Sequence, residues 1–172
     1  NNMKIAVIGY SGSGKSTLAG KLSQKYGVPV LYIDTIQFLP DWVVRADEEK
    51  QAMLTDFLDT NGGWVIDGNY KKLSYDRRME EADKIIFLAF NRFSCVYRAI
   101  KRYFTYKGKT RASMADGCKE KIDFEFLTWV FYKGRTKERR KVYFDTIKKY
   151  ESKSVIIKNQ RQLDRFEKEM GL

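Results

Sequence analysis

Apolar residues in this chain gather into short unbroken runs. Five runs are rich in β-branched residues and do not alternate with polar ones: residues 4–8, 30–33, 64–66, 84–90 and 154–158. Strands that are buried on both faces of a sheet have this pattern. Helix-like segments separate the runs, so the pattern predicts a parallel α/β sheet with helices on its faces.

The segments between these runs repeat apolar residues every three or four positions, which predicts helices. We expect helices at residues 16–26, 47–60, 92–104, 123–132, 136–150 and 161–170. Two stripes are expected to face the core: Met53, Leu54, Phe57 and Leu58 in one helix, and Phe93, Val96, Tyr97, Ile100 and Phe104 in another. The second stripe would turn Arg98 and Arg102 away from the core.

Length and composition favour a single cytoplasmic domain over residues 3–172. The chain has 172 residues, no internal repeat and no linker rich in Pro, Gly or Ser. We find neither an 18-residue apolar run nor a charged-then-apolar leader, so no membrane partner is expected. The two cysteines, Cys95 and Cys118, stand alone and fit a reducing compartment. Histidine is absent, which excludes acid–base catalysis by imidazole.

The basic excess is confined to one part of the chain. Residues 1–90 hold 11 Lys and Arg against 12 Asp and Glu, whereas residues 91–150 hold 17 against 6. Such a segment attracts polyanions, which include nucleic acid, anionic lipid and the phosphates of a substrate. Charge alone does not choose among them.

A phosphate-binding motif follows the first predicted strand. Gly9, Gly14, Lys15 and Ser16 satisfy G-x-x-x-x-G-K-[ST], with a strand before and a helix after. Loop N–H groups and the helix N-terminus would hold the phosphates of ATP, Lys15 would reach the β- and γ-phosphates, and Ser16 would bind Mg²⁺. The expected nucleotide-binding residues are Gly9, Tyr10, Ser11, Gly12, Ser13, Gly14, Lys15, Ser16 and Thr17.

A second metal-binding group is expected in WVIDGNYKK, residues 64–72. Asp67 ends an apolar run and could hold a Mg²⁺-bound water beside Ser16. The next residue is Gly68, where motor ATPases usually have the glutamate that activates water, so transfer to an acceptor is favoured over hydrolysis. The alternative is a tight hairpin turn at Asp67–Gly68, because D-G between apolar runs is a hairpin signal.

Four stretches together resemble a known family: GYSGSGKSTLA, IDTIQFLPDW, WVIDGNY and ADKIIFLAFNR. They are similar to P-loop kinases of the adenylate-kinase-like and shikimate-kinase-like group, and most similar to the bacterial subgroup called DNA topology modulation proteins. The resemblance covers nearly the whole chain. It implies a three-layer P-loop fold with a five-stranded parallel sheet, a mobile basic helical lid, ATP and Mg²⁺ as donor, and a small-molecule acceptor facing the loop.

The resemblance also assigns roles to residues of the acceptor side. Asp67 matches the aspartate that positions magnesium in nucleotide kinases, and Lys71 falls where their motif has an arginine for the acceptor phosphate. Asp34 matches the shikimate-type aspartate that holds or deprotonates the acceptor hydroxyl, although a carboxylate in a turn explains it equally well. The candidate acceptor residues are Asp34, Trp42, Arg45, Asn69 and Lys71.

The basic segment is predicted to form the lid, with its flanking helices at about residues 98–140. In the resembling kinases, arginines at both ends of the lid converge on the triphosphate. The candidates here are Arg98, Arg102, Arg135 and Arg139, with Arg111 as a weaker one. Arg140 competes with Arg139, because the helical phase is not fixed by the sequence.

Nucleic-acid binding is the alternative function. Tyr103, Tyr106, Trp129 and Tyr132 interleave with basic residues, as stacking platforms for bases do, although they also suit a core. No helix-turn-helix, zinc-ligand or RNP pattern supports it. The sequence therefore favours an ATP- and Mg²⁺-dependent small-molecule kinase over a protein that modulates DNA topology.

Overall fold

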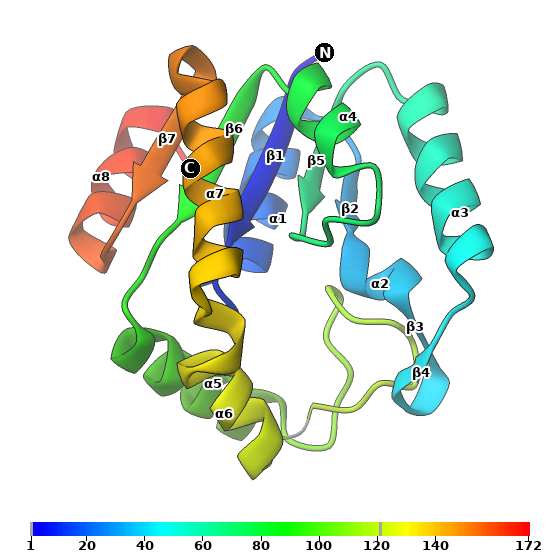
Figure 1. Ribbon diagram of the computed structural model, residues 1–172, viewed down its shortest axis with the longest axis vertical. Helices are drawn as coiled ribbons and strands as arrows, with labels where there is room; N and C mark the ends of the chain where they lie inside the picture. Colours follow the sequence, from blue (N-terminus) through cyan, green and yellow to red (C-terminus); the bar gives the residue numbers. More distant parts are fainter. Residues whose placement is uncertain (1, 121) are drawn as a thin grey trace.

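The computed structural model describes residues 2–120 and 122–172, and a five-stranded sheet lies at its centre. The strand order is β2-β5-β1-β6-β7, and all neighbouring strands are parallel. The strands are β1 (Lys4–Gly9), β2 (Val30–Tyr32), β5 (Trp64–Asp67), β6 (Lys84–Leu88) and β7 (Ser154–Ile157). The predicted five-stranded parallel sheet is thus confirmed (Figure 1).

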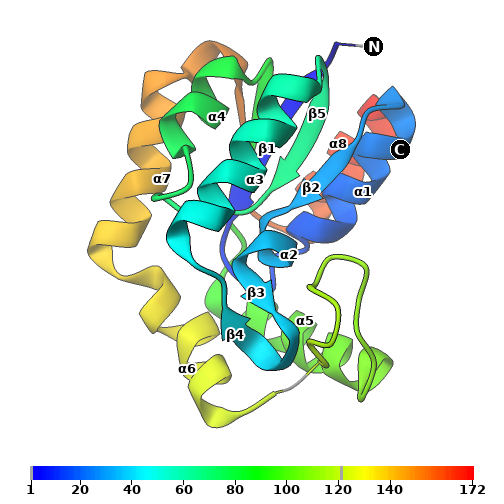
Figure 2. The same ribbon diagram turned by 90° about the vertical axis from the view of Figure 1, so that its right-hand side faces the viewer.

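Helices cover both faces of this sheet and make three layers. One face carries α1 (Lys15–Tyr26) and α8 (Gln160–Met170), and the other carries α4 (Tyr75–Glu81) and α7 (Lys137–Lys149) (Figure 2). Helix α3 (Asp47–Thr60) lies beyond β2 at the edge of the sheet (Figure 1). It buries Leu54 and Leu58 as predicted, whereas Met53 is exposed.

The core forms where the central strands meet these layers. Strands β1, β5 and β6 are buried along nearly their whole lengths, with Ile5, Trp64 and Phe87 fully inaccessible. Apolar side chains on both faces explain why these runs do not alternate with polar residues. Burial of these side chains stabilises the fold by about 25 cal/mol per Å² of apolar surface.

The remaining elements gather at the carboxyl ends of the strands (Figure 1). They are α2 (Ile33–Gln37), the antiparallel pair β3 (Phe38–Leu39) and β4 (Val43–Val44), α5 (Arg92–Tyr106) and α6 (Phe124–Phe131). Short 3₁₀ turns occur at Pro40–Trp42, Lys133–Arg135 and Glu151–Lys153. The sequence pattern did not predict α2, α4 or the β3–β4 pair, because two to seven residues are too few to establish a period.

The apolar stripe of α5 is mostly exposed, contrary to the prediction, and of its residues only Val96 packs half-buried against the core. Phe93, Tyr97 and Phe104 are 72%, 67% and 73% exposed, and Ile100 is also exposed. The helix instead buries Cys95 and Ala99. These small side chains let α5 approach the phosphate loop closely, and this packing turns the large apolar side chains to the surface.

The alternative of a hairpin at Asp67–Gly68 is excluded by the sheet. Strand β5 pairs in parallel with β1 and β2, and the chain then runs through a turn into α4. Asp67 is therefore the last residue of a central strand. No helix of the described chain is long and apolar enough to span a membrane.

Candidate active site

The phosphate loop connects β1 to α1, so the helix N-terminus opens over the end of the central strand. Such a helix end attracts anions. Two glycines of the phosphate loop are required because other backbone atoms pack closely against them. A Cβ on Gly9 would lie 2.4 Å from the Leu88 carbonyl oxygen, and one on Gly12 would lie 2.6 Å from the Cys95 carbonyl oxygen. The backbones at Leu88 and in α5 therefore pack directly against the loop and restrict its shape.

Lys15, Ser16 and Asp67 lie together at this loop, as the sequence predicts. The Lys15 ammonium donates to the Tyr10 carbonyl at 3.1 Å, so it lies folded over the loop. The Ser16 hydroxyl donates to Asp67 Oδ2 at 2.5 Å, which joins the first turn of α1 to the end of β5.

Asp67 is a buried carboxyl with one unpartnered oxygen. Burial raises its pKa, against the opposing effects of the Lys15 charge and the Ser16 hydrogen bond. Its Oδ1 is buried and has no hydrogen-bond partner within the described residues. A buried carboxylate oxygen beside a serine hydroxyl fits Mg²⁺, which prefers oxygen ligands and takes few of them from the protein.

Asp34 lies in the first turn of α2, directly after β2, and its partner is Tyr70. The Tyr70 hydroxyl donates a short hydrogen bond to Asp34 Oδ1, and burial together with the Asp34 charge raises the pKa of Tyr70. The charge of Asp34 also contributes to the raised pKa of Asp67. The charge of Asp34 therefore reaches Asp67 across the site. Tyr70 was named in the sequence motif, but its partner could not be inferred.

The loop after β5 is held by a buried arginine that the sequence did not single out. Arg78 is fully inaccessible and donates to the carbonyls of Gly68, Asn69, Tyr70 and Leu73. Burial lowers the pKa of Arg78 to about 10, so the side chain stays charged at neutral pH. A single basic residue in a polar segment carries no sequence signal for this role.

Asn69, a predicted acceptor residue, uses both ends of its amide on the protein. Its Oδ1 accepts from the Gly9 N–H at 3.0 Å, and its Nδ2 donates to the Gly9 carbonyl at 2.8 Å. This pair ties the loop after β5 to the start of the phosphate loop. Asn69 also borders the site cavity, and its contacts make it a brace between the two loops.

The other predicted acceptor residues divide into two groups. Trp42 and Lys71 border the same cavity as Asp34. Arg45 is not among the cavity-lining residues described, because its Nε donates to the Ile36 carbonyl at 3.0 Å and its guanidinium pairs with Glu49.

The lid arginines also divide. Arg98, Arg102 and Arg139 border the cavity, and so does Arg111 from the lid. Arg98 lies against the phosphate loop, since a Cβ on Gly14 would be 3.2 Å from its Nη1. Arg135 and Arg140 border a different hollow, which settles the phase of α7 in favour of Arg139.

Glu120 holds two of these arginines, and the sequence did not predict it. Its buried carboxylate accepts from Arg102 Nε at 2.8 Å and from Arg111 Nε at 2.6 Å. Burial lowers the pKa of Arg102, and the neighbouring Arg111 charge acts in the same direction. One acidic residue in a strongly basic segment is easily read as a surface charge, so its position became evident only from the structure.

Trp129, on α6, borders the cavity and contacts the phosphate loop. Its Nε1 donates to the Ser11 hydroxyl at 3.2 Å, and the Arg139 guanidinium lies over its ring at 4.6 Å from the centroid. The sequence left this tryptophan open between a core residue and a base-stacking residue. The structure places it beside the loop instead.

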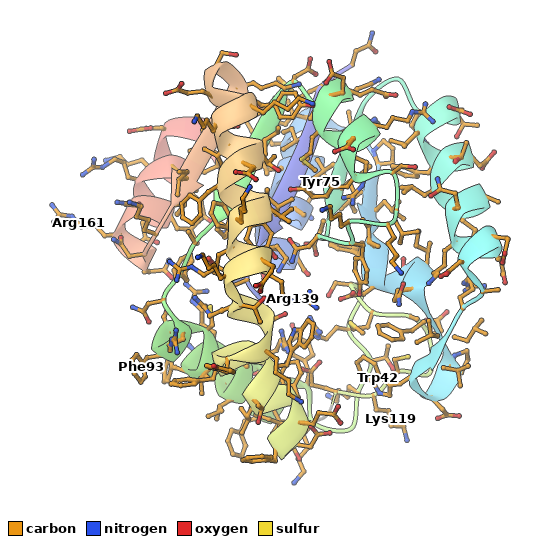
Figure 3. All side chains as sticks on the ribbon, viewed as in Figure 1. Trp42, Tyr75, Phe93, Lys119, Arg139 and Arg161 are labelled. Carbon is orange, nitrogen blue, oxygen red and sulfur yellow. The ribbon has the colours of Figure 1, made fainter. Side chains whose placement is uncertain are left out.

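These groups open onto one cavity of about 1220 Å³ at the carboxyl ends of the strands. Figure 3 shows Arg139 on α7 and Trp42 near β4 on opposite sides of the space below the sheet. Ligands of open α/β sheets bind at this edge. The volume exceeds the range of about 300–1,000 Å³ that is typical of a single small-molecule site.

Comparison with known proteins supports the fold. No protein-family model and no curated protein matches the chain. A gluconokinase from Sinorhizobium meliloti 1021 superimposes with a TM-score of 0.53 at 18% identity, over 95% of this chain and 86% of its own. A deoxyadenosine kinase from M. mycoides gives a TM-score of 0.51 at 16% identity, over 98% of both chains. The chain therefore has a P-loop kinase-like fold.

Proposed function

We propose that this protein is an ATP- and Mg²⁺-dependent kinase that transfers the γ-phosphoryl group to a hydroxyl of a small molecule. One observation carries the proposal: the phosphate loop, with Lys15 and Ser16, opens onto the same cavity as Asp34. A phosphate cradle alone fits any P-loop protein. A second carboxylate site across one shared cavity is what transfer to an acceptor requires.

In this proposal the residues of the chain position the donor and neutralise its charge. The loop N–H groups and Lys15 would hold the β- and γ-phosphates. Ser16 and Asp67 would hold Mg²⁺, which supplies charge neutralisation to the phosphates when bound. Arg98 and Arg139, which border the cavity from two elements, would face the charge that develops on the transferred group.

Asp34 would act on the acceptor. Its carboxylate would accept the proton of the acceptor hydroxyl as that oxygen attacks the γ-phosphorus, and the bond to the ADP oxygen breaks. The hydrogen bond from Tyr70 fixes the carboxylate in one orientation and leaves its second oxygen for the acceptor. Tyr70 is thus a positioning residue in this proposal.

The acceptor is best sought by a screen of ADP release. The names of the two structural neighbours make gluconate and deoxyadenosine the first compounds to test, followed by other nucleosides, nucleotides and small alcohols. We expect release of ADP that depends on both Mg²⁺ and one acceptor class. The Lys15→Ala protein is the blank, and Lys25→Ala, on the same helix, is the matched control that should keep full activity.

The same screen tests the kinase function against the DNA-binding alternative. The finer resemblance, to DNA topology modulation proteins, rests on the GNY element and stays part of this proposal. Failure of every acceptor, together with ADP release equal in wild type and Lys15→Ala, would contradict the kinase function. An unshifted melting temperature at millimolar Mg²⁺–ATP would contradict nucleotide binding itself, because a ligand that binds only the folded state must stabilise it.

A further inference from the structure

A second cavity lies on the other side of the phosphate loop from the site described above. Its volume is about 340 Å³, within the range of small-ligand sites. It is formed by the segment after β6, the start of α5, the Lys133–Arg135 turn, α7, the residue after β7 and one residue of the phosphate loop. Its lining residues are Tyr10, Ala89, Phe90, Asn91, Arg92, Phe93, Arg135, Arg140, Phe144 and Lys158.

The charge of this cavity is of one sign. Its lining holds Arg92, Arg135, Arg140 and Lys158, and none of the lining residues described is acidic. None of the four takes part in an ion pair found in the described chain. The active-site cavity differs, since its arginines face several carboxylates. Four uncompensated cations around one hollow focus a positive potential that selects an anion.

One of these cations is fixed in place by neutral partners. The Arg135 guanidinium donates to the Phe90 carbonyl at 2.8 Å and to Cys95 Sγ at 3.0 Å. It also lies 3.9 Å from the centroid of the Tyr10 ring. Its orientation is therefore set without a counter-charge, so an incoming anion would not have to displace a carboxylate.

The walls of the cavity are aromatic. Phe90, Phe93, Phe144 and Tyr10 border it, and Phe93 is the most exposed of them. Figure 3 shows Phe93 at the lower left, away from Trp42 and Arg139, which border the active-site cavity. An exposed ring beside unpaired arginines is the combination that stacks on a base while cations hold its phosphate.

We propose that this cavity binds a nucleotide unit, that is, a planar base with its phosphate, separately from the donor ATP. The unit has two possible sources: a free nucleotide, or one residue of a single strand. An inorganic anion would use the cations but not the rings. A base pair inside a duplex has both ring faces covered, so duplex DNA does not fit.

The test uses a fluorescent base whose emission is quenched by stacking. 2-Aminopurine riboside monophosphate is titrated into the full-length protein at physiological salt, with Mg²⁺ and a non-hydrolysable ATP analogue saturating the phosphate loop. A second arm uses a short oligo(dT) that carries one 2-aminopurine. Both arms are repeated on Lys15→Ala, so that the result does not depend on the loop binding ATP.

Two matched pairs of variants locate the binding. Phe93→Ala is compared with Phe104→Ala, because both rings are exposed on α5 and each contacts one aromatic neighbour. Arg140→Gln is compared with Arg161→Gln, an exposed arginine of α8 outside the cavity. We expect each cavity variant to weaken binding about tenfold, the effect of losing one charge-assisted contact or stacking partner. The two control variants should bind like wild type.

Each outcome of this titration either supports or overturns the proposal. Binding of the monophosphate with this pattern of variants supports a free-nucleotide site, and the same pattern with the oligonucleotide alone supports a strand site. The proposal is overturned if neither probe binds at physiological salt. Equal weakening by the controls would show that the effect is not specific to this cavity, and loss of probe binding in Lys15→Ala would assign the probe to the donor site; either result also overturns the proposal.

Discussion

At the scale of single residues, the ionised carboxylate of Asp67 lowers the stability of the fold, although the proposed activity requires it. Its folded-state pKa lies above the ordinary 3.8 because of burial. Between these two values the folded protein binds more protons than the unfolded chain, so stability falls as pH rises through this window and stays lower above it. An ionised carboxylate that has an unpartnered buried oxygen is therefore a cost to the protein without metal.

Asp67→Asn should remove this cost. We expect the variant to be more stable than wild type at pH 7 without Mg²⁺, by on the order of 1 kcal/mol, and to match it more closely near pH 4. Its Mg²⁺-dependent turnover should be lost, while nucleotide binding without metal persists. Urea denaturation at the two pH values, with a turnover assay, checks this. A variant that is less stable at pH 7 would contradict the cost of the buried charge, and full Mg²⁺-dependent turnover would contradict the metal assignment.

Arg78 is the residue whose loss should damage the site most without touching a ligand. Arg78→Met would leave four backbone carbonyls of the loop after β5 without their donor. We expect a loss of roughly 3 kcal/mol or more in the free energy of unfolding, since each buried unsatisfied group costs about 1–3 kcal/mol. Urea denaturation measures it.

The adjacent residue supplies the control for this prediction. Arg77 is 37% exposed at its side chain and forms surface ion pairs with Asp59 and Glu81. Arg77→Met should therefore cost less than about 1 kcal/mol. Equal losses of unfolding free energy in the two variants would show that the buried hydrogen bonds of Arg78 do not stabilise the protein. This result would contradict the role of Arg78 in holding the loop after β5.

At the scale of elements, the segment predicted to form the lid packs against β3 and the turn that follows it. Met114, Ala115 and Cys118 form a small buried cluster with Phe38 and Trp42. This cluster is separate from the main core. We therefore predict that the segment at residues 107–120 opens without unfolding of the sheet.

Met114→Ala should weaken the docking of the lid and leave the fold intact. We expect faster tryptic cleavage at Lys107, Lys109 or Lys119, with a melting temperature that changes little, because the cluster is small. Met53→Ala, which removes an exposed methionine of α3, is the control and should not alter cleavage. A large drop in melting temperature for Met114→Ala would show that the lid is part of the main core instead.

How far the sequence predicts each element depends on its length and on what packs against it. The five strands and six longer helices are evident from their apolar patterns, and the phosphate loop from its spacing. The prediction that the apolar stripe of α5 faces the core was wrong, because amphipathicity identifies an apolar face but not the surface that this face contacts. Contacts such as Glu120 with Arg102, or Tyr70 with Asp34, join residues 18 and 36 positions apart and leave no local pattern.

At the scale of the whole molecule, the basic excess lies mainly outside the active site. The net charge is +11, yet seven basic and six acidic side chains line the large cavity among the described residues. The cavity lining is therefore nearly balanced in charge. The remaining positive charge lies outside the large cavity, with four of its side chains around the smaller one, and this arrangement determines how the protein meets a polyanion.

Duplex DNA should accordingly bind weakly and without competing with ATP. We expect a Kd in the range of about 10⁻⁴ to 10⁻⁶ M at physiological salt, no sequence preference, and a steep loss of affinity as salt rises. Because this binding uses outer-surface charge, saturating Mg²⁺–ATP should leave it unchanged. Fluorescence anisotropy of a labelled duplex at two salt concentrations, with and without Mg²⁺–ATP, measures all three quantities. Nanomolar affinity that survives physiological salt, or displacement of the duplex by Mg²⁺–ATP, would mean that nucleic acid enters the large cavity, and the kinase function would then give way to the DNA-binding alternative.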